Sequence, residues 1–112
     1  MAYIERFSDS DLERIVDEAT IYMCACPAQV AVAVRQLRNL RRYQLACLSE
    51  TDTQSDVHQA IAESAVRAHA ELEACLDRVL DMEGWDRVTL RMPEGIRQRR
   101  NALVEGATDE SA

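Results

Sequence analysis

The four cysteines are the residues of this 112-residue chain whose types and spacing point most directly to chemistry. Two of them stand in the run Cys24-Ala25-Cys26-Pro27. Residues two apart in a regular helix point about 200° away from each other, so this pair shares a ligand only where a helix is interrupted. Pro27 predicts such an interruption. At the start of the next helix, the free backbone N–H groups would lower the pKa of the Cys26 thiol.

A third thiol joins this pair if the two long segments 27–49 and 56–82 form an antiparallel hairpin. A turn centred near Asp52 and Thr53 places Cys75 level with position 30, about one helical turn from Cys26. Cys24, Cys26 and Cys75 are therefore the candidate metal ligands. Three thiolates and a fourth ligand suit zinc or an iron–sulfur cluster, and a softer set suits copper(I). The fourth ligand has no candidate in the sequence, so a partner subunit or a small molecule would supply it.

The alternative is that the cysteines are packing residues, because cysteine is among the most buried residue types. Cys47 and Cys75 both fall on the apolar stripes of their segments, as structural cysteines would. His58 and His69 lie three helical turns apart, about 16 Å along the axis, which is too far for one metal. We expect both histidines at the surface or its boundary.

The segment from about residue 8 to residue 25 is predicted to form the first helix. Ser8 is a suitable N-cap, and Phe7 and Leu12 occupy the two positions of a hydrophobic staple. The apolar residues recur at steps of three and four: Leu12, Ile15, Val16, Ala19, Tyr22 and Met23. Pro27 suits the first position of a second helix, so a break is predicted near it. A single long helix kinked at Pro27 is the other interpretation.

Two long amphipathic helices, about 27–49 and about 56–82, are predicted to form an antiparallel hairpin joined by a polar loop. The apolar stripe of the first comprises Val30, Val34, Leu37, Leu40, Cys47 and Leu48, with Gln44 as its polar member. The stripe of the second comprises Val57, Ile61, Ser64, Ala68, Leu72, Cys75, Val79 and Met82. Gly84 is a natural C-terminal stop for it.

The pattern weakens after Gly84. An extended segment lying against the bundle is expected for the apolar positions Trp85, Val88, Leu90 and Met92. Pro93 opens a short C-terminal helix over about 94–104, and residues 106–112 are expected to be a frayed tail. The sequence therefore predicts an all-α fold, a small helical bundle that forms a single domain over residues 1–112.

Charge and composition limit the functions that are open to the chain. It carries a net charge of −7 at pH 7, and each of its 13 basic residues is arginine. An acidic chain repels nucleic acid and anionic membranes, so neither is an expected partner. The longest nearly apolar stretch, from Ala28 to Val34, is too short to span a bilayer. Four cysteines without an export signal indicate reduced thiols and a cytoplasmic protein.

Two groups of arginines remain. Arg35, Arg38 and Arg42 form a stripe expected to be a solvated face that meets acidic residues of the next helix. The C-terminal part is locally basic, and we expect it to dock on the acidic first helix of a neighbour or to bind an anion. This second group comprises Arg87, Arg91, Arg97, Arg99 and Arg100.

No Gly-rich phosphate loop or catalytic signature occurs in the sequence, which favours a protein that is not an enzyme. Apolar residues such as Val32 and Leu45 lie beside the main stripe, and long helices of this kind often complete a bundle by dimerising. The sequence thus favours a homodimer that acts through self-association or a protein partner. A thiolate metal, iron–sulfur or thiol-redox site at Cys24, Cys26 and Cys75 is the alternative function.

Overall fold

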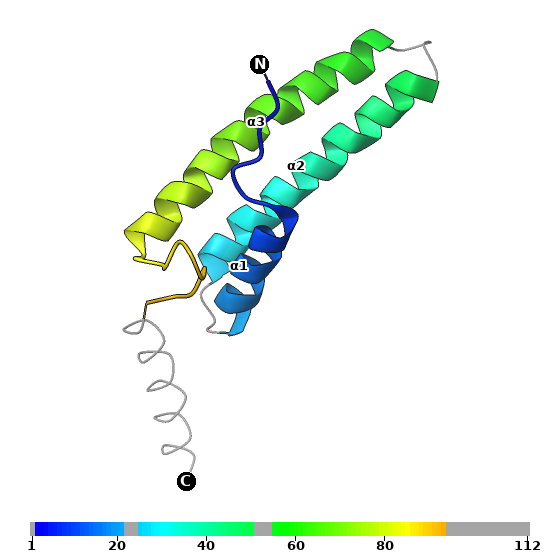
Figure 1. The fold of residues 1–112 in the computed structure, drawn as a ribbon. Helices are drawn as coiled ribbons and strands as arrows, with labels where there is room; N and C mark the ends of the chain where they lie inside the picture. The colour runs from blue at the N-terminus through cyan, green and yellow to red at the C-terminus, as the bar shows by residue number, and fades with distance from the viewer. Residues whose placement is uncertain (1, 22–24, 51–54, 94–112) are drawn as a thin grey trace, which may run out of the picture.

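The computed structural model describes residues 2–21, 25–50 and 55–93, and every regular element in these ranges is a helix. In chain order they are α1 (Asp9–Ile21), α2 (Ala25–Glu50) and α3 (Ser55–Met82). α2 and α3 lie side by side as a long hairpin, and α1 packs across α2 (Figure 1). The predicted all-α class and the helical hairpin are confirmed. The predicted C-terminal helix and the tail fall outside the described residues.

α1 begins where the sequence places its cap. The Asp11 N–H donates to Ser8 Oγ at 3.0 Å, and the Ser8 N–H donates to Asp11 Oδ2 at 3.0 Å. This reciprocal pair is a capping box in which an aspartate takes the place of the usual Glu or Gln. Phe7 and Leu12 are both buried in the core, as the staple predicts.

α2 starts as a separate helix at Ala25, with Pro27 as its third residue. A proline is tolerated in the first turn because the N–H groups there have no intrahelical acceptor. Because α1 packs against α2, the break predicted near Pro27 is confirmed and the single kinked helix is wrong. Pro27 itself is buried.

The register of the hairpin agrees with the predicted turn, but the buried face of α3 differs from the prediction. His58 Nδ1 lies 2.7 Å from Gln44 Oε1, and Arg38 Nε lies 2.9 Å from His69 Nε2. The residues of α3 that are buried are Ala62, Ala65, His69, Glu73, Leu76 and Leu80. The predicted stripe lies on the adjacent face, where Val57 is 51% exposed and Met82 is 80% exposed.

α3 ends at Met82, and Gly84 follows it in a Schellman motif, the stop that the sequence predicts. Gly84 has a φ of 74°, which favours glycine, and its N–H donates to the Asp81 carbonyl at 3.0 Å. The Trp85 N–H donates to the Leu80 carbonyl at 2.9 Å. The chain then folds back on itself, so that Asp86 and Arg91 form an isolated antiparallel bridge.

This turning segment replaces the extended one that the sequence predicts. Trp85, Leu90 and Met92 are buried against the bundle, as predicted, but Val88 is 93% exposed at the tip. Asp86 Oδ1 accepts the N–H groups of Val88 and Thr89, both at 2.9 Å, and these bonds lower the pKa of Asp86. Arg87 is paired with Asp77 and Asp81, so this predicted basic residue is neutralised within its own chain.

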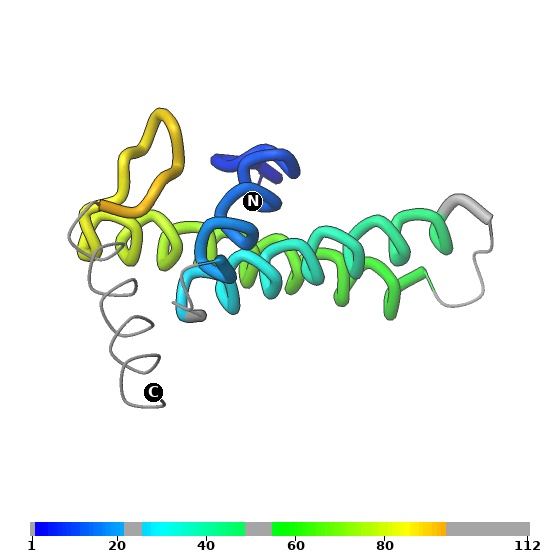
Figure 2. Tube along the Cα trace, turned by 90° about the horizontal axis from the view of Figure 1, so that it is seen from below, coloured from blue at the N-terminus to red at the C-terminus, as the bar shows by residue number. Residues whose placement is uncertain are grey.

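The hydrophobic core lies toward one end of the hairpin. It joins Leu12, Ile15 and Ala19 of α1 with Ala31 and Val34 of α2 and Leu76 and Leu80 of α3. The C-terminal part of α2 and the N-terminal part of α3 extend beyond α1 as a two-helix section (Figure 2). None of the described helices has the length and apolar character that crossing a membrane requires.

Candidate functional site

Of the three predicted thiolate ligands, the structure describes Cys26 and Cys75. Cys24 lies outside the described residues, Cys26 is exposed in the first turn of α2, and Cys75 is half-buried on α3. Among the described residues, no group of three metal-ligating side chains comes together. The site at Cys24, Cys26 and Cys75 stays a prediction. Its test is the metal content of wild-type protein compared with a Cys24→Ser/Cys26→Ser variant.

A buried cluster of Arg38, His69 and Glu73 is the most unusual feature of the structure. Their side chains are 1%, 2% and 1% exposed, although the sequence predicts Arg38 and His69 at the surface or its boundary. Both expectations are wrong. A charged residue is fully buried almost only when it is paired, and here the pairing joins α2 to α3.

Arg38 uses all three guanidinium nitrogens. Nε donates to His69 Nε2 at 2.9 Å, and Nη1 donates to Asp9 Oδ1 at 2.7 Å. Nη2 donates to the Phe7 carbonyl at 2.5 Å and to Glu73 Oε2 at 2.9 Å. The hydrogen bond from Arg38 is the main reason why the pKa of Asp9 is lowered. Arg38 thus ties both helices of the hairpin to the start of α1.

Glu73 holds the segment that precedes α1. Its Oε2 accepts the backbone N–H groups of Arg6 at 2.9 Å and Phe7 at 3.1 Å, as well as the Arg38 bond. Backbone groups buried without partners are costly, so this carboxylate satisfies the segment as it crosses the hairpin. We call residues 2–7 the N-terminal strap.

The protonation state of His69 follows from its partner. An arginine only donates hydrogen bonds, so Nε2 of His69 must be the acceptor and the ring is neutral, with its proton on Nδ1. Burial, opposed by Glu73 and reinforced by Arg38, lowers the pKa of His69. The Nδ1 atom lies 3.6 Å from Glu73 Oε1. The cluster therefore joins α2, α3 and the strap through a neutral histidine.

Near its N-terminal end, the strap makes an aromatic contact with this cluster through Tyr3. The Tyr3 ring lies 5.0 Å from the His69 ring, and the Arg41 guanidinium stands 3.7 Å above the Tyr3 ring centroid. The Tyr3 hydroxyl bonds Glu5. Burial, together with this carboxylate, raises the pKa of Tyr3 to about 12.

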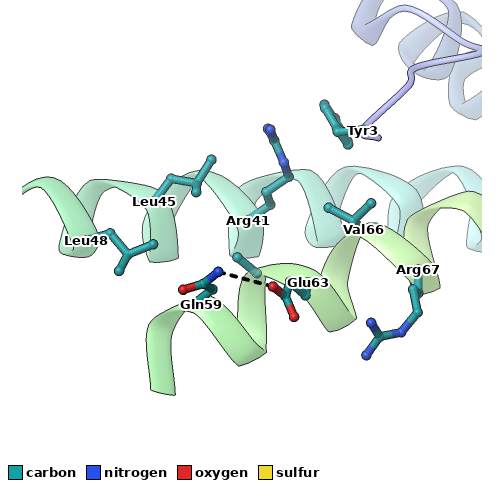
Figure 3. Close-up of a pocket in the computed structure, with 9 residues that line it drawn as sticks. Tyr3, Arg41, Leu45, Leu48, Gln59, Glu63, Val66 and Arg67 are labelled. Atoms are coloured by element: carbon teal, nitrogen blue, oxygen red, sulfur yellow. Dashed lines mark hydrogen bonds between the residues drawn. The ribbon is translucent and has the colours of Figure 1, made fainter. Parts of the chain in front are cut away.

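A groove begins at Tyr3, near the N-terminal end of the strap. It has a volume of about 660 Å³ and lies between the C-terminal part of α2 and the N-terminal part of α3. Figure 3 shows Arg41 rising from α2 toward Tyr3, while Gln59 and Glu63 are joined on α3. The groove is lined by Tyr3, Arg41, Leu45, Glu63, Val66 and Arg67, among others.

The opposite side of the hairpin carries the apolar stripe that the sequence predicted as core. At about 100° per residue, this stripe lies roughly a quarter-turn from the buried face of α3, away from the strap. Leu40 and Cys47 of α2 face the same side. We call this surface the outer face, and it comprises Leu40, Cys47, Val57, Ile61, Ser64, Ala68, Leu72, Cys75, Val79 and Met82.

Two features of the site could not be predicted from the sequence. Arg38, His69 and Glu73 were missed because a helical face with a charged centre reads as solvated, and their partners lie 29 to 67 positions away. The only local signal was that His69 and Glu73 stand four residues apart, one helical turn. Tyr3 gave no pattern at all.

The chain was compared with protein families, curated proteins and solved structures. No protein-family model, no curated protein and no solved structure matches the chain.

Proposed function

We propose that this protein is a helical interaction protein that self-associates through the outer face of its α2–α3 hairpin. The observation that carries the proposal is the apolar stripe of α3, which runs from Val57 to Met82 and which the single chain leaves at its surface or half-covered. Contiguous apolar surface of this extent marks interaction sites on proteins.

The size of the outer face suits a pair of chains. Val57 and Met82 are 25 positions apart, about 38 Å of helix, and two packed helices present a width of about 18 Å. The product is about 700 Å² per copy, close to the roughly 800 Å² per partner of a standard interface. Two hairpins packed face to face would form a four-helix arrangement, as the predicted homodimer requires.

The charge distribution favours a second copy as the occupant. None of the ten outer-face residues is charged, in a chain where 29% of residues are. Depletion of charge is typical of interface centres. Two copies that each carry a net charge of −7 repel one another, and an uncharged face is where they approach at the lowest electrostatic cost.

The test is the mass of the protein in solution, measured by analytical ultracentrifugation. We expect the wild-type chain to sediment at twice its mass of 12.7 kDa. Ala68 is exposed in the middle of the outer face, so Ala68→Glu should give a monomer because two carboxylates would be buried against each other. Ala60→Glu is the matched control, since Ala60 is exposed on the same helix about 80° further round, and it should leave the dimer intact.

Two results would contradict the proposal. One is a wild-type chain that remains a monomer at about 100 µM, a concentration at which a specific dimer is expected to form. The other is a dimer that survives Ala68→Glu. Helix content from circular dichroism, unchanged in both variants, shows that the substitutions act on association.

The composition indicates the compartment and the kind of partner. Four cysteines are compatible with a reducing compartment, so we propose a cytoplasmic protein. The acidic charge makes proteins the favoured partners over nucleic acid.

A further inference from the structure

We propose that the groove at the end of the N-terminal strap binds an amphipathic helix of a partner protein, one that carries carboxylates beside its apolar stripe. This surface lies on the opposite side of the hairpin from the outer face. It would add a second kind of contact to the self-association proposed above, without depending on it.

The spacing of the lining residues fits a helix. On α2 the groove is lined by Arg41, Leu45 and Leu48, at steps of four and three. On α3 the lining recurs at the same steps through Gln59, Ala62, Glu63 and Val66. Both walls therefore run along the helix axes for about 11 Å, roughly two helical turns, and both carry apolar residues among polar ones.

The groove continues a surface that the chain already covers with its own residues. α1 and the N-terminal strap lie on this side of the hairpin over the half that holds the core (Figures 1 and 2). Tyr3 is both the end of the strap contact and part of the groove lining. A helix bound beyond Tyr3 would extend this covering layer over the two-helix section.

The charged side chains in the groove favour a partner helix that carries carboxylates. Among the described residues, Arg38, Arg42 and Arg87 each form ion pairs with carboxylates. Arg41 and Arg67 instead contact the Tyr3 ring and the Ser64 hydroxyl.

Among the described residues that line the groove, the one carboxylate is Glu63, which accepts a bond from Gln59 at 3.3 Å. Two cations beside one anion give the groove a positive balance within a chain of net charge −7. Carboxylates on the bound helix would complement this balance, whereas a basic helix would meet repulsion.

The experiment uses the full chain and a fluorescein-labelled helical peptide of about 14 residues, roughly four turns, with Leu along one stripe and Glu beside it. A matched peptide replaces each Glu by Lys. Fluorescence anisotropy should show saturable binding of the Glu peptide and at least about tenfold weaker binding of the Lys peptide. Binding of the Glu peptide should weaken when salt is raised from about 0.05 M to about 0.3 M.

The variants locate the binding. Arg67→Glu should weaken the Glu peptide several-fold and strengthen the Lys peptide, because it reverses the charge of one wall. Leu45→Glu should weaken both peptides by placing a charge on the apolar lining of the groove. Arg78→Glu is the matched control, because Arg78 is exposed on α3 three turns from Arg67 and outside the groove, and it should leave both affinities unchanged.

The outcomes that overturn the inference are distinct. A Glu peptide that shows no saturation up to about 1 mM excludes the groove as a helix site of useful affinity. Equal losses in Arg67→Glu and Arg78→Glu mean that binding follows net charge and not the groove. If Leu45→Glu dissociates the dimer, the groove is the contact between copies, and both the groove inference and the outer-face proposal are wrong. Failure of the outer face alone, shown by Ala68→Glu, leaves the peptide result untouched.

Discussion

At the scale of single residues, stability rests on an arginine in the interior. Arg38 bonds groups from the strap, α1 and α3 at once, and three of them, the Phe7 carbonyl, His69 and Glu73, are themselves buried. A buried ion pair adds little net stability over apolar packing, yet removing one partner is strongly destabilising because the other charge stays behind. The network therefore specifies how the strap and the hairpin fit together.

We predict that Arg38→Met lowers the free energy of unfolding by about 3–5 kcal/mol, since Glu73 would remain buried without its cation. Urea denaturation followed by circular dichroism measures the change. Arg42→Met is the matched control on the same helix, because Arg42 is 53% exposed and should change stability by at most about 1 kcal/mol. Similar losses in the two variants would mean that the cluster is dispensable.

We predict that stability falls as the pH drops below 6.5, the usual pKa of histidine. The folded protein holds His69 neutral with a lowered pKa, so the unfolded chain binds the proton more readily. The contribution is complete above pH 6.5 and is lost as the pH falls through the folded-state pKa. The charged and titratable groups facing His69 are Arg38, Arg41, Glu5, Glu73 and Tyr3.

Urea denaturation between about pH 5 and about pH 7.5 checks this prediction, because histidine is the side chain whose usual pKa falls in that window. His69→Gln supplies an amide oxygen that accepts from Arg38 and carries no proton to titrate. Its stability should vary less with pH than that of the wild type. An unchanged slope in His69→Gln would assign the pH dependence to other groups.

At the scale of helices, the ends of the elements follow from local chemistry. The Ser8 hydroxyl caps α1 by accepting the N–H of Asp11, in the first turn of the helix. The N–H of Gly84, just after α3, donates to the carbonyl of Asp81 in the last turn. These interactions join residues only a few positions apart, which is why the sequence predicts them.

We predict that Ser8→Ala lowers the free energy of unfolding by about 1 kcal/mol, because it removes the acceptor for the Asp11 N–H. Ser10→Ala is the matched control, two residues further along in the first turn of α1, and should have little effect. Thermal or urea denaturation of the two variants compares them directly. Equal effects would show that the Ser8 hydroxyl does not cap the helix.

The face that a long helix buries is harder to predict than its ends. On α3 the larger apolar side chains, such as Val57, Ile61 and Val79, form a regular stripe that suggests a core. The structure buries the adjacent stripe, in which Ala62 and Ala65 allow close approach and His69 and Glu73 are polar. Small and polar residues carry little hydrophobic signal, and the partners that make their burial favourable come from distant segments.

At the scale of the whole molecule, the all-α class, the hairpin and the separate first helix could be predicted from periodicity, Pro27 and Gly84. The placement of the strap could not, since it depends on bonds between Glu73 and backbone groups 66 and 67 positions away. On α3 the predicted stripe and the buried face differ. An apolar stripe that the folded chain leaves outside is what an interface between chains requires.

The uneven covering of the hairpin also divides the molecule energetically. The half that contacts α1 holds nearly the whole apolar core, whereas the described residues that are buried beyond Tyr3 are Gln44, Ala62 and Ala65. Local opening is easiest where few apolar contacts are broken. Amide hydrogens near Leu45 and Ala62 should therefore exchange with solvent through partial opening, while those near Val34 and Leu76 should wait for global unfolding. Any ligand that fills the groove would slow exchange in the first group and leave the second unchanged.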